Sequence, residues 1–248
     1  MNWLLLLGLI AAYAWYVRGG GVASGRGRVA RYRRWMRRAP LAFGGSALVA
    51  LTLGGQIAAL TTLPPEFAGI ARHARYLAGF SNDPVMLKLA AIGGLCGGAL
   101  IGILLSHWRM RRGKAPMMAG NLTAILPRQR SEFIWTTALG AAAGVVEELF
   151  FRLALPLFAA LATSSAEFGF ILATILFAFA HRYQGGVGMV FTGTAGALLA
   201  TIYLATGDLW FAMLVHVLLN LNGLVLRPAL LGCPPREMPV VPPPSDRL

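Results

Sequence analysis

Two adjacent carboxylates and a guanidinium interrupt an otherwise apolar stretch of this sequence. The segment GVVEELFFRLALPLF, residues 144–158, carries Glu147, Glu148 and Arg152 among hydrophobic side chains. If the segment crosses a bilayer, each charge at its centre costs at least about 2.5–3.5 kcal/mol, so such groups are kept mainly where they pair or perform chemistry. Of the nine acidic residues in the chain, only these two lie deep within an apolar segment. The cluster is therefore the first candidate for a functional site.

Helical spacing predicts different roles for the two glutamates. Glu148 and Arg152 are four residues apart with the acid N-terminal, which is the favourable spacing and order for an ion pair. Glu147 points roughly 100° away around the helix and is less well placed for that pair. We therefore expect Arg152 to neutralise and brace Glu148, which leaves Glu147 free to face another helix as a general base.

Further polar groups lie in two later apolar segments. His181 ends the run FILATILFAFAH, and Phe177 lies one turn earlier on the same face. His216 lies within DLWFAMLVHVLLNLNGLVL, with Asn220 four residues later on its face, whereas Asn222 is predicted to point elsewhere. A single buried histidine is more often a packed core residue than a catalyst. Here three separate late segments each contribute polar groups, which favours one shared site.

Two chemistries would use this set of side chains. In the first, Glu147 and His181 activate a water molecule, and His216 with Asn220 donates hydrogen bonds to a developing oxyanion. In the second, Glu147, His181 and His216 ligate zinc, and the metal activates the water instead. The sequence contains no HExxH motif or other tight ligand spacing, so spacing alone does not choose between the two.

Nucleophilic catalysis has weaker support. No serine or cysteine pairs with the buried histidines in a recognisable motif, although Thr192 and Thr194 lie in a late apolar segment. Cys96 lies within an apolar segment and Cys233 at the start of a proline-rich tail, with neither disulfide nor metal spacing.

The composition indicates that these segments cross a membrane. The chain is 57% hydrophobic and 12% charged, whereas a soluble domain carries about 25% charged residues. We predict an all-α fold, a polytopic transmembrane helical bundle with about seven spans (six to eight), because a span needs roughly 20 apolar residues. The first segment is predicted to be an anchor, since it lacks the basic start and cleavage site of a signal peptide. The predicted spans are 2–17, 41–63, 85–107, 133–162, 167–181, 187–206 and 208–226.

The basic residues predict the orientation of the bundle. Of 22 Lys and Arg residues, 18 follow the first, third, fifth and seventh spans. This bias places the N-terminus outside and the C-terminus in the cytoplasm, in a multi-pass protein of the cell inner (cytoplasmic) membrane. Because the basic clusters directly flank apolar segments, the net charge of +13 favours contact with the lipid bilayer and argues against nucleic acid as a partner.

The sequence also predicts boundaries and packing. We divide it into N-terminal helices with basic loops (1–129), a core that carries the polar groups (130–226) and a proline-rich cytoplasmic tail (227–248). Pro156 is expected to kink or end its helix about one turn after the charged cluster. The glycine runs GLCGG (94–98) and GTAG (193–196) predict close helix packing within a bilayer.

Three motifs together resemble a known family. EELFFR at 147–152 matches an EExxxR pattern, FAFAH at 177–181 matches FxxxH, and HVLLN at 216–220 matches HxxxN. Their order and distribution over successive segments resemble the CPBP family, the CAAX-protease and bacteriocin-processing group of intramembrane glutamate proteases. The resemblance covers about residues 130–226.

The resemblance implies a role for each motif residue. Glu147 and His181 would activate the attacking water, and His216 and Asn220 would form the oxyanion site. Glu148 and Arg152 would support Glu147, with Phe177 as a further supporting residue. The implied enzyme is a metal-independent peptidase without a cofactor, whose catalytic groups line a cavity open to the cytoplasm or the membrane.

We therefore expect an intramembrane endopeptidase that cleaves a peptide or a membrane-anchored protein. Bacterial members of the family suggest removal of a C-terminal sorting anchor, as in the myxosortase-like branch, or maturation of a peptide. One alternative is a non-enzymatic immunity or scaffold protein that binds a peptide in the same cavity. A transporter would also use intramembrane Glu and His, but the inverted repeats expected of one are not found in the sequence.

Overall fold

The computed structural model describes residues 1–19, 27–79 and 83–232, and within them all regular structure is helical. The predicted all-α fold is therefore confirmed. The Pro-rich segment predicted at 234–248 and Cys233 lie outside the described residues, as does part of the first basic loop. The α-helices are α1 (Asn2–Arg18), α2 (Arg28–Ala39), α3 (Ser46–Leu53), α4 (Ala68–Leu77), α5 (Pro84–Arg111), α6 (Phe133–Glu148), α7 (Leu155–Thr163), α8 (Ala166–Ala180), α9 (Gly185–Thr206), α10 (Leu209–Leu221) and α11 (Arg227–Leu231).

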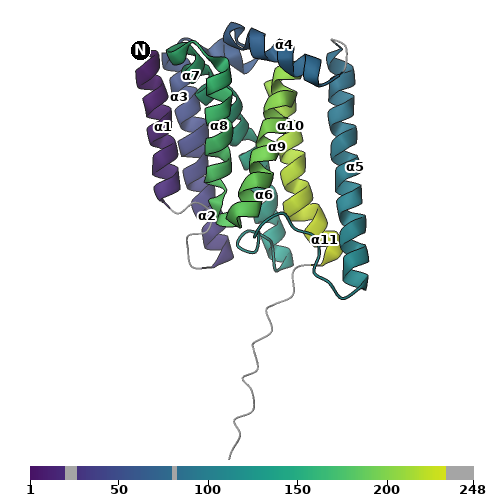
Figure 1. Cartoon of the computed structure of the whole chain (residues 1–248). Coiled ribbons are helices and arrows are strands. Elements are labelled where there is room, and N and C mark those ends of the chain that lie inside the picture. The colour runs from purple at the N-terminus through teal and green to yellow at the C-terminus, as the bar shows by residue number, and fades with distance from the viewer. Residues whose placement is uncertain (20–26, 80–82, 233–248) are drawn as a thin grey trace, which may run out of the picture.

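The long helices stand side by side in one bundle, and the short helix α4 lies across one end of it (Figure 1). The N-terminus lies at the α4 end. The start of α2, the end of α5 and helix α11 lie at the opposite end, so the arginine-bearing segments of these helices share that end. Such a one-sided distribution of basic residues agrees with the predicted orientation, which stays a prediction.

Helix α5 gives the clearest physical sign of a membrane. Three helical stretches are long and apolar enough to cross one, namely Pro84–Arg111, Arg182–Thr206 and Leu209–Leu231. The most apolar window of α5 has a mean hydropathy of 2.1, yet only 6% of that window is buried inside the protein. An apolar helix that its own protein does not cover needs lipid around it. The chain is a multi-pass membrane protein, and the exact number of spans stays a prediction.

Two predicted spans differ from the helices observed. For the span predicted at 41–63, the helix begins at Arg28 and ends at Leu53, because the arginine-rich stretch is itself a good helix former. The helix ends where Gly55 adopts a positive φ of 68°, and short 3₁₀ turns follow at Ile57–Leu60 and Pro65–Phe67. The last predicted span, 208–226, continues as helix to Leu231, so the first five residues assigned to the tail belong to the bundle.

Pro156 was predicted to kink or end its helix, and the structure shows that it does not end it. Helices α6 and α7 form one uninterrupted helical stretch through η6 (Leu149–Ala154), a π-helical segment that ends two residues before the proline. Proline lacks an N–H and clashes with the preceding turn of an α-helix, and the wider π turn accommodates both defects. The same device recurs at η8 (Asn222–Leu226), which joins α10 to α11 ahead of Pro228.

The glycine predictions were half right. A Cβ on Gly196 would lie 2.8 Å from the ring of Phe177, and one on Gly193 would lie 3.3 Å from Ala178, so the GTAG run does pack closely. A Cβ on Gly94, Gly97 or Gly98 would meet nothing within 4 Å. The prediction of close packing for GLCGG is therefore wrong within the described chain, because α5 stands on the outside of the bundle.

The close contact between α6 and α10, the two helices that carry Glu147, Glu148 and His216, was not predicted from the sequence. Helix α6 packs on α10 through Gly140 and Gly144. A Cβ on Gly144 would lie 2.7 Å from the backbone nitrogen of Val217, which cannot move aside as a flexible side chain can. The spacing of these two glycines is the GxxxG pattern of close helix pairs in membranes, and it was the available signal.

Replacing Gly144 by alanine should therefore destabilise the protein. Forcing a methyl group against the α10 backbone should lower the free energy of unfolding by about 1–3 kcal/mol, as overpacked sites do. The measurement is unfolding of the purified protein in mixed detergent micelles, with Gly98→Ala as the matched control. Gly98 faces open space, so that change should cost nothing and can stabilise the helix by up to about 1 kcal/mol. Equal stabilities of the two variants would contradict the close α6–α10 contact.

Candidate active site

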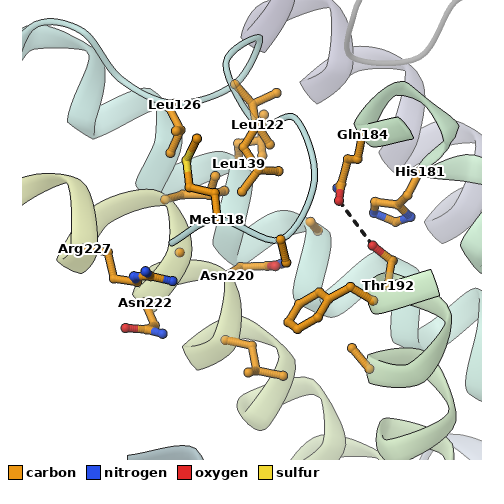
Figure 2. Close-up of a pocket in the computed structure, with 18 of the residues that line it drawn as sticks. Met118, Leu122, Leu126, Leu139, His181, Gln184, Thr192, Asn220, Asn222 and Arg227 are labelled. Atoms are coloured by element: carbon orange, nitrogen blue, oxygen red, sulfur yellow. Dashed lines mark hydrogen bonds between the residues drawn. The ribbon is translucent and has the colours of Figure 1, made fainter. Parts of the chain in front are cut away.

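The polar groups predicted from the sequence meet at one cavity of about 470 Å³. Its walls come from α6, α8, α9 and α10, and the loop 115–126 closes one side (Figure 2). Glu147 is 14 residues into α6, or about 21 Å along the helix at 1.5 Å per residue. The site therefore lies deep in the bundle. The predicted residues that line it are Glu147, Phe177, His181, His216 and Asn220.

Glu148 does not line this cavity but joins two other charged groups behind it. Its Oε2 lies 3.2 Å from the Nε of Arg152, which is the ion pair predicted from their spacing. Its Oε1 lies 2.7 Å from the Nδ1 of His216 on α10. Glu148 is fully buried and Arg152 is 2% exposed. The Glu148 carboxylate therefore bonds to Arg152 on the π segment η6 and to His216 on α10, a helix far along the chain but adjacent in space.

Arg152 has two further partners besides the carboxylate. Its Nη2 donates to the carbonyl oxygen of Gly196 on α9 at 3.3 Å. Its guanidinium carbon stands 4.3 Å from the ring centroid of Phe177 on α8, a cation–π contact. The absence of a side chain at Gly196 leaves room for Phe177 and Arg152, since a Cβ there would lie 2.8 Å from the Phe177 ring and 3.5 Å from Arg152 Nη2. Arg152 thus ties η6 to α8 and α9.

Glu147 is placed differently from its neighbour. Among the described residues, its one charged partner within 4 Å is His216, whose Nε2 lies 3.9 Å from the Oε2 of Glu147. That distance is too long for a direct hydrogen bond. Glu147 is 6% exposed and faces the cavity, so its carboxylate is free to bind a group there.

The hydrogen bonds of the two histidines decide which ring nitrogen carries a proton. His181 Nδ1 lies 2.8 Å from the carbonyl oxygen of Phe177, and a carbonyl only accepts, so this nitrogen is the donor. In neutral His181 the Nε2 is then an acceptor. His216 Nδ1 likewise donates to the Glu148 carboxylate. Its Nε2 carries a hydrogen only when the ring is positively charged.

The two asparagines of α10 and η8 both line the cavity. Asn220 Nδ2 donates to the carbonyl oxygen of Gly140 at 3.2 Å, which uses one of its two hydrogens. The Asn222 side chain points away from that of Asn220 and lies beside Arg227, which agrees with the direction predicted for it (Figure 2). Its Oδ1 is buried without a hydrogen-bond partner among the described residues.

The geometry bears on the zinc alternative. Nowhere in residues 1–19, 27–79 and 83–232 do three His, Cys, Asp or Glu side chains group as metal ligands. The donor set around Glu147 therefore does not match the close three-ligand arrangement that zinc requires.

Several residues of the cavity wall were not predicted from the sequence. Thr192 donates to Oε1 of the buried Gln184 at 3.3 Å (Figure 2), so this hydroxyl is engaged structurally. Gly120 of the loop 115–126 packs against Gly188, and the Asn121 N–H donates to the Gln184 carbonyl at 2.9 Å. These contacts join segments far apart in sequence, and no motif marks them. The missed lining residues include Tyr16, Trp35, Met118, Leu122, Gln184 and Arg227.

Comparison with known proteins supports the resemblance seen in the motifs. Residues 129–222 match the family model described as Type II CAAX prenyl endopeptidase Rce1-like, and the similarity to the CPBP family is confirmed over this segment. No curated protein and no solved structure matches the chain. The matched segment begins four residues before α6, ends at the first residue of η8 and holds every predicted catalytic residue. The match supports a peptidase that acts on a peptide or protein in a membrane.

The buried ion pair should show strong energetic coupling. Arg152→Gln and Glu148→Gln should each destabilise the protein by about 3–5 kcal/mol, because each leaves an uncompensated buried charge. The double variant should cost less than the sum by about 1–3 kcal/mol in a double-mutant cycle of unfolding free energies.

The ion pair between Lys88 and Asp208 is the matched control. Its side chains are 37% and 33% exposed, and its nitrogen and oxygen lie 2.6 Å apart. Its coupling should be only about 0–1 kcal/mol. A coupling at Glu148–Arg152 no larger than this control would show that the pair does not organise the core.

Proposed function

We propose that the protein is an intramembrane glutamate endopeptidase and that Glu147 activates the attacking water. The observation that carries the proposal is the unequal partnering of two adjacent buried carboxylates. Glu148 is held by Arg152 and His216, whereas Glu147 faces the cavity with His216 Nε2 at 3.9 Å. A structural role alone would be served by two equally paired carboxylates, and the free one is suited to act as a base.

Charge balance supports a donor role for His216. With Glu147 and Glu148 ionised and Arg152 protonated, the buried cluster has a net charge of −1. A positively charged His216 makes the cluster neutral, which reduces the cost of burying it. In that form the Nε2–H of His216 donates into the cavity. An imidazolium beside Asn220 then supplies hydrogen bonds to an oxyanion, the role expected from the family resemblance.

The reaction follows from these roles. The Glu147 carboxylate, assisted by His181, removes a proton from water, and the water oxygen bonds to the carbonyl carbon of the peptide. Electrons of the C=O bond move to its oxygen, where His216 and Asn220 stabilise the negative charge. When the tetrahedral intermediate collapses, the C–N bond breaks and the proton taken up by Glu147 passes to the leaving nitrogen. The products are a new carboxyl group and a new amine.

The walls of the cavity favour an apolar peptide as substrate. Most of the lining is aliphatic or aromatic, and the loop 115–126 contributes Met117, Met118 and Leu122. Methionines adapt to varied side chains. We propose a membrane-anchored protein or a membrane-associated peptide as the substrate, cleaved in or near the cytoplasmic membrane. Removal of a sorting anchor and maturation of a peptide both fit this chemistry.

Loss of the Glu147 carboxylate should abolish cleavage. Purified protein in detergent micelles is incubated with a library of apolar peptides, and products are identified by mass spectrometry. Glu147→Gln should lower kcat by about 10²–10⁴-fold, the contribution of a general base, with His181→Ala in the same range. Glu167→Gln is the control, since Glu167 is an exposed acid at the start of α8 whose Oε2 accepts a hydrogen bond from Ser165. Full activity of Glu147→Gln would refute the mechanism.

Chelation separates this mechanism from zinc catalysis. Cleavage should persist within about twofold after dialysis against EDTA or 1,10-phenanthroline, because the water is activated by side chains rather than by a Lewis acid. Loss of activity that added zinc restores would favour the metal mechanism. If the wild-type protein cleaves nothing but binds a peptide equally well with Glu147, His181, His216 and Asn220 all replaced, the non-enzymatic alternative holds.

A further inference from the structure

One aromatic hydroxyl at the cavity comes from outside the segment that matches the family model. Tyr16 lies on α1 and is 4% exposed, yet it lines the same cavity as Glu147. Tyr183 lines the same cavity, and Arg182 bonds to the backbone of Val17, the residue next to Tyr16. Tyr16 has no part in the mechanism derived above, and no sequence motif singles it out.

The hydrogen bond between Tyr16 and Trp35 fixes where the tyrosine hydrogen can go. Trp35 Nε1 lies 3.0 Å from the Tyr16 hydroxyl oxygen, and both side chains are buried. An indole nitrogen only donates, so Tyr16 is the acceptor and its own hydrogen must point away from Trp35. Among the described residues this hydrogen finds no protein acceptor within bonding distance. The Tyr16 hydroxyl therefore has a hydrogen available to donate, and Tyr16 lines the cavity.

The Tyr16 ring is held rigidly in this position. Its centroid lies 4.6 Å from that of Phe43, which in turn packs 5.1 Å from Phe150 and 5.2 Å from Phe151 on η6. At the same end of α1, Arg182 donates to the carbonyl oxygen of Val17 at 3.0 Å. Because Phe150 and Phe151 lie two and three residues after Glu148, the aromatic stack ties Tyr16 to the helical segment that follows both carboxylates.

We propose that Tyr16 is a positioning residue whose hydroxyl donates a hydrogen bond to the Glu147 carboxylate through one bridging water. The indole of Trp35 presets the direction of this donor, so no rotation of the phenol is needed. The hydrogen bond stabilises the ionised carboxylate and orients its second oxygen toward the cavity. Helix α1 thereby supplies part of the site, although the family match begins only at residue 129. The catalytic consequence rests on the proposed function of Glu147, whereas the hydrogen bond itself does not.

Carbodiimide labelling tests the hydrogen bond without a substrate. Dicyclohexylcarbodiimide reacts with protonated buried carboxyl groups, and peptide mapping by mass spectrometry resolves Glu147 from Glu148. In the purified full-length protein, Tyr16→Phe should raise the labelling rate of Glu147 about threefold to tenfold, the factor that one ordinary hydrogen bond represents. Trp35→Phe should raise it by a smaller factor, because the hydroxyl remains but is no longer directed.

Tyr13→Phe is the matched control for these variants. Tyr13 lies one turn before Tyr16 on α1, is also buried, and donates its hydroxyl to the carbonyl oxygen of Leu176 at 2.9 Å. It does not line the cavity. Its loss should lower thermal stability and leave the labelling rate of Glu147 unchanged. Wild-type labelling rates in both Tyr16→Phe and Trp35→Phe would overturn the inference.

Kinetics with a peptide that the wild-type protein cleaves supply the second readout. Tyr16→Phe should lower kcat about tenfold with KM within about twofold, whereas Tyr13→Phe should keep both constants. If Glu147→Gln is inactive and Tyr16→Phe labels and cleaves at wild-type rates, the inference fails while the proposed function stands. If Tyr16→Phe alters labelling but Glu147→Gln cleaves fully, the hydrogen bond stands and the proposed function fails.

Discussion

The fold depends on how two adjacent carboxylates are buried within one bundle of apolar helices. Glu148 contacts both Arg152 and His216, and these two partners offset the cost of burying its charge. Arg152 also donates to the Gly196 carbonyl and contacts the Phe177 ring. The charged cluster therefore connects α6 with α8, α9 and α10. Removing any member leaves an unpaired buried charge, which is why the cluster fixes the relative positions of α6, α8, α9 and α10.

Backbone features make this cluster possible. The glycines of α6 bring α10 close enough for His216 to reach Glu148, since a Cβ on Gly144 would collide with the α10 backbone. The π segment η6 carries Arg152 and precedes Pro156. A wider turn there tolerates the missing N–H of the proline and changes the direction of side chains along the rod. The proline therefore shapes the helix around the charged group rather than ending it.

Local spacing predicted a large part of the site, and its limits are physical. The pairing of Glu148 with Arg152 follows from four residues on one helix, and a composition of 57% hydrophobic residues is enough to indicate a membrane bundle. The bond from His216 to Glu148 joins residues 68 apart in the chain, and no periodicity encodes it. The packing of GLCGG was misread because composition does not say which residues, if any, lie against a glycine.

The walls of the cavity show how the two halves of the chain cooperate. Glu147, His181, His216 and Asn220 all fall within residues 129–222, but Tyr16, Trp35 and the loop 115–126 precede that segment and Arg227 follows it. Arg227 also donates to Ser106 of α5 and to the Met117 carbonyl, so it fastens the lipid-exposed helix and the cavity loop to α11. These outer parts and the matched segment therefore share the wall of the cavity that Glu147 faces. On the proposed function, the matched segment therefore supplies the chemistry, while residues outside that segment contribute to the choice of substrate.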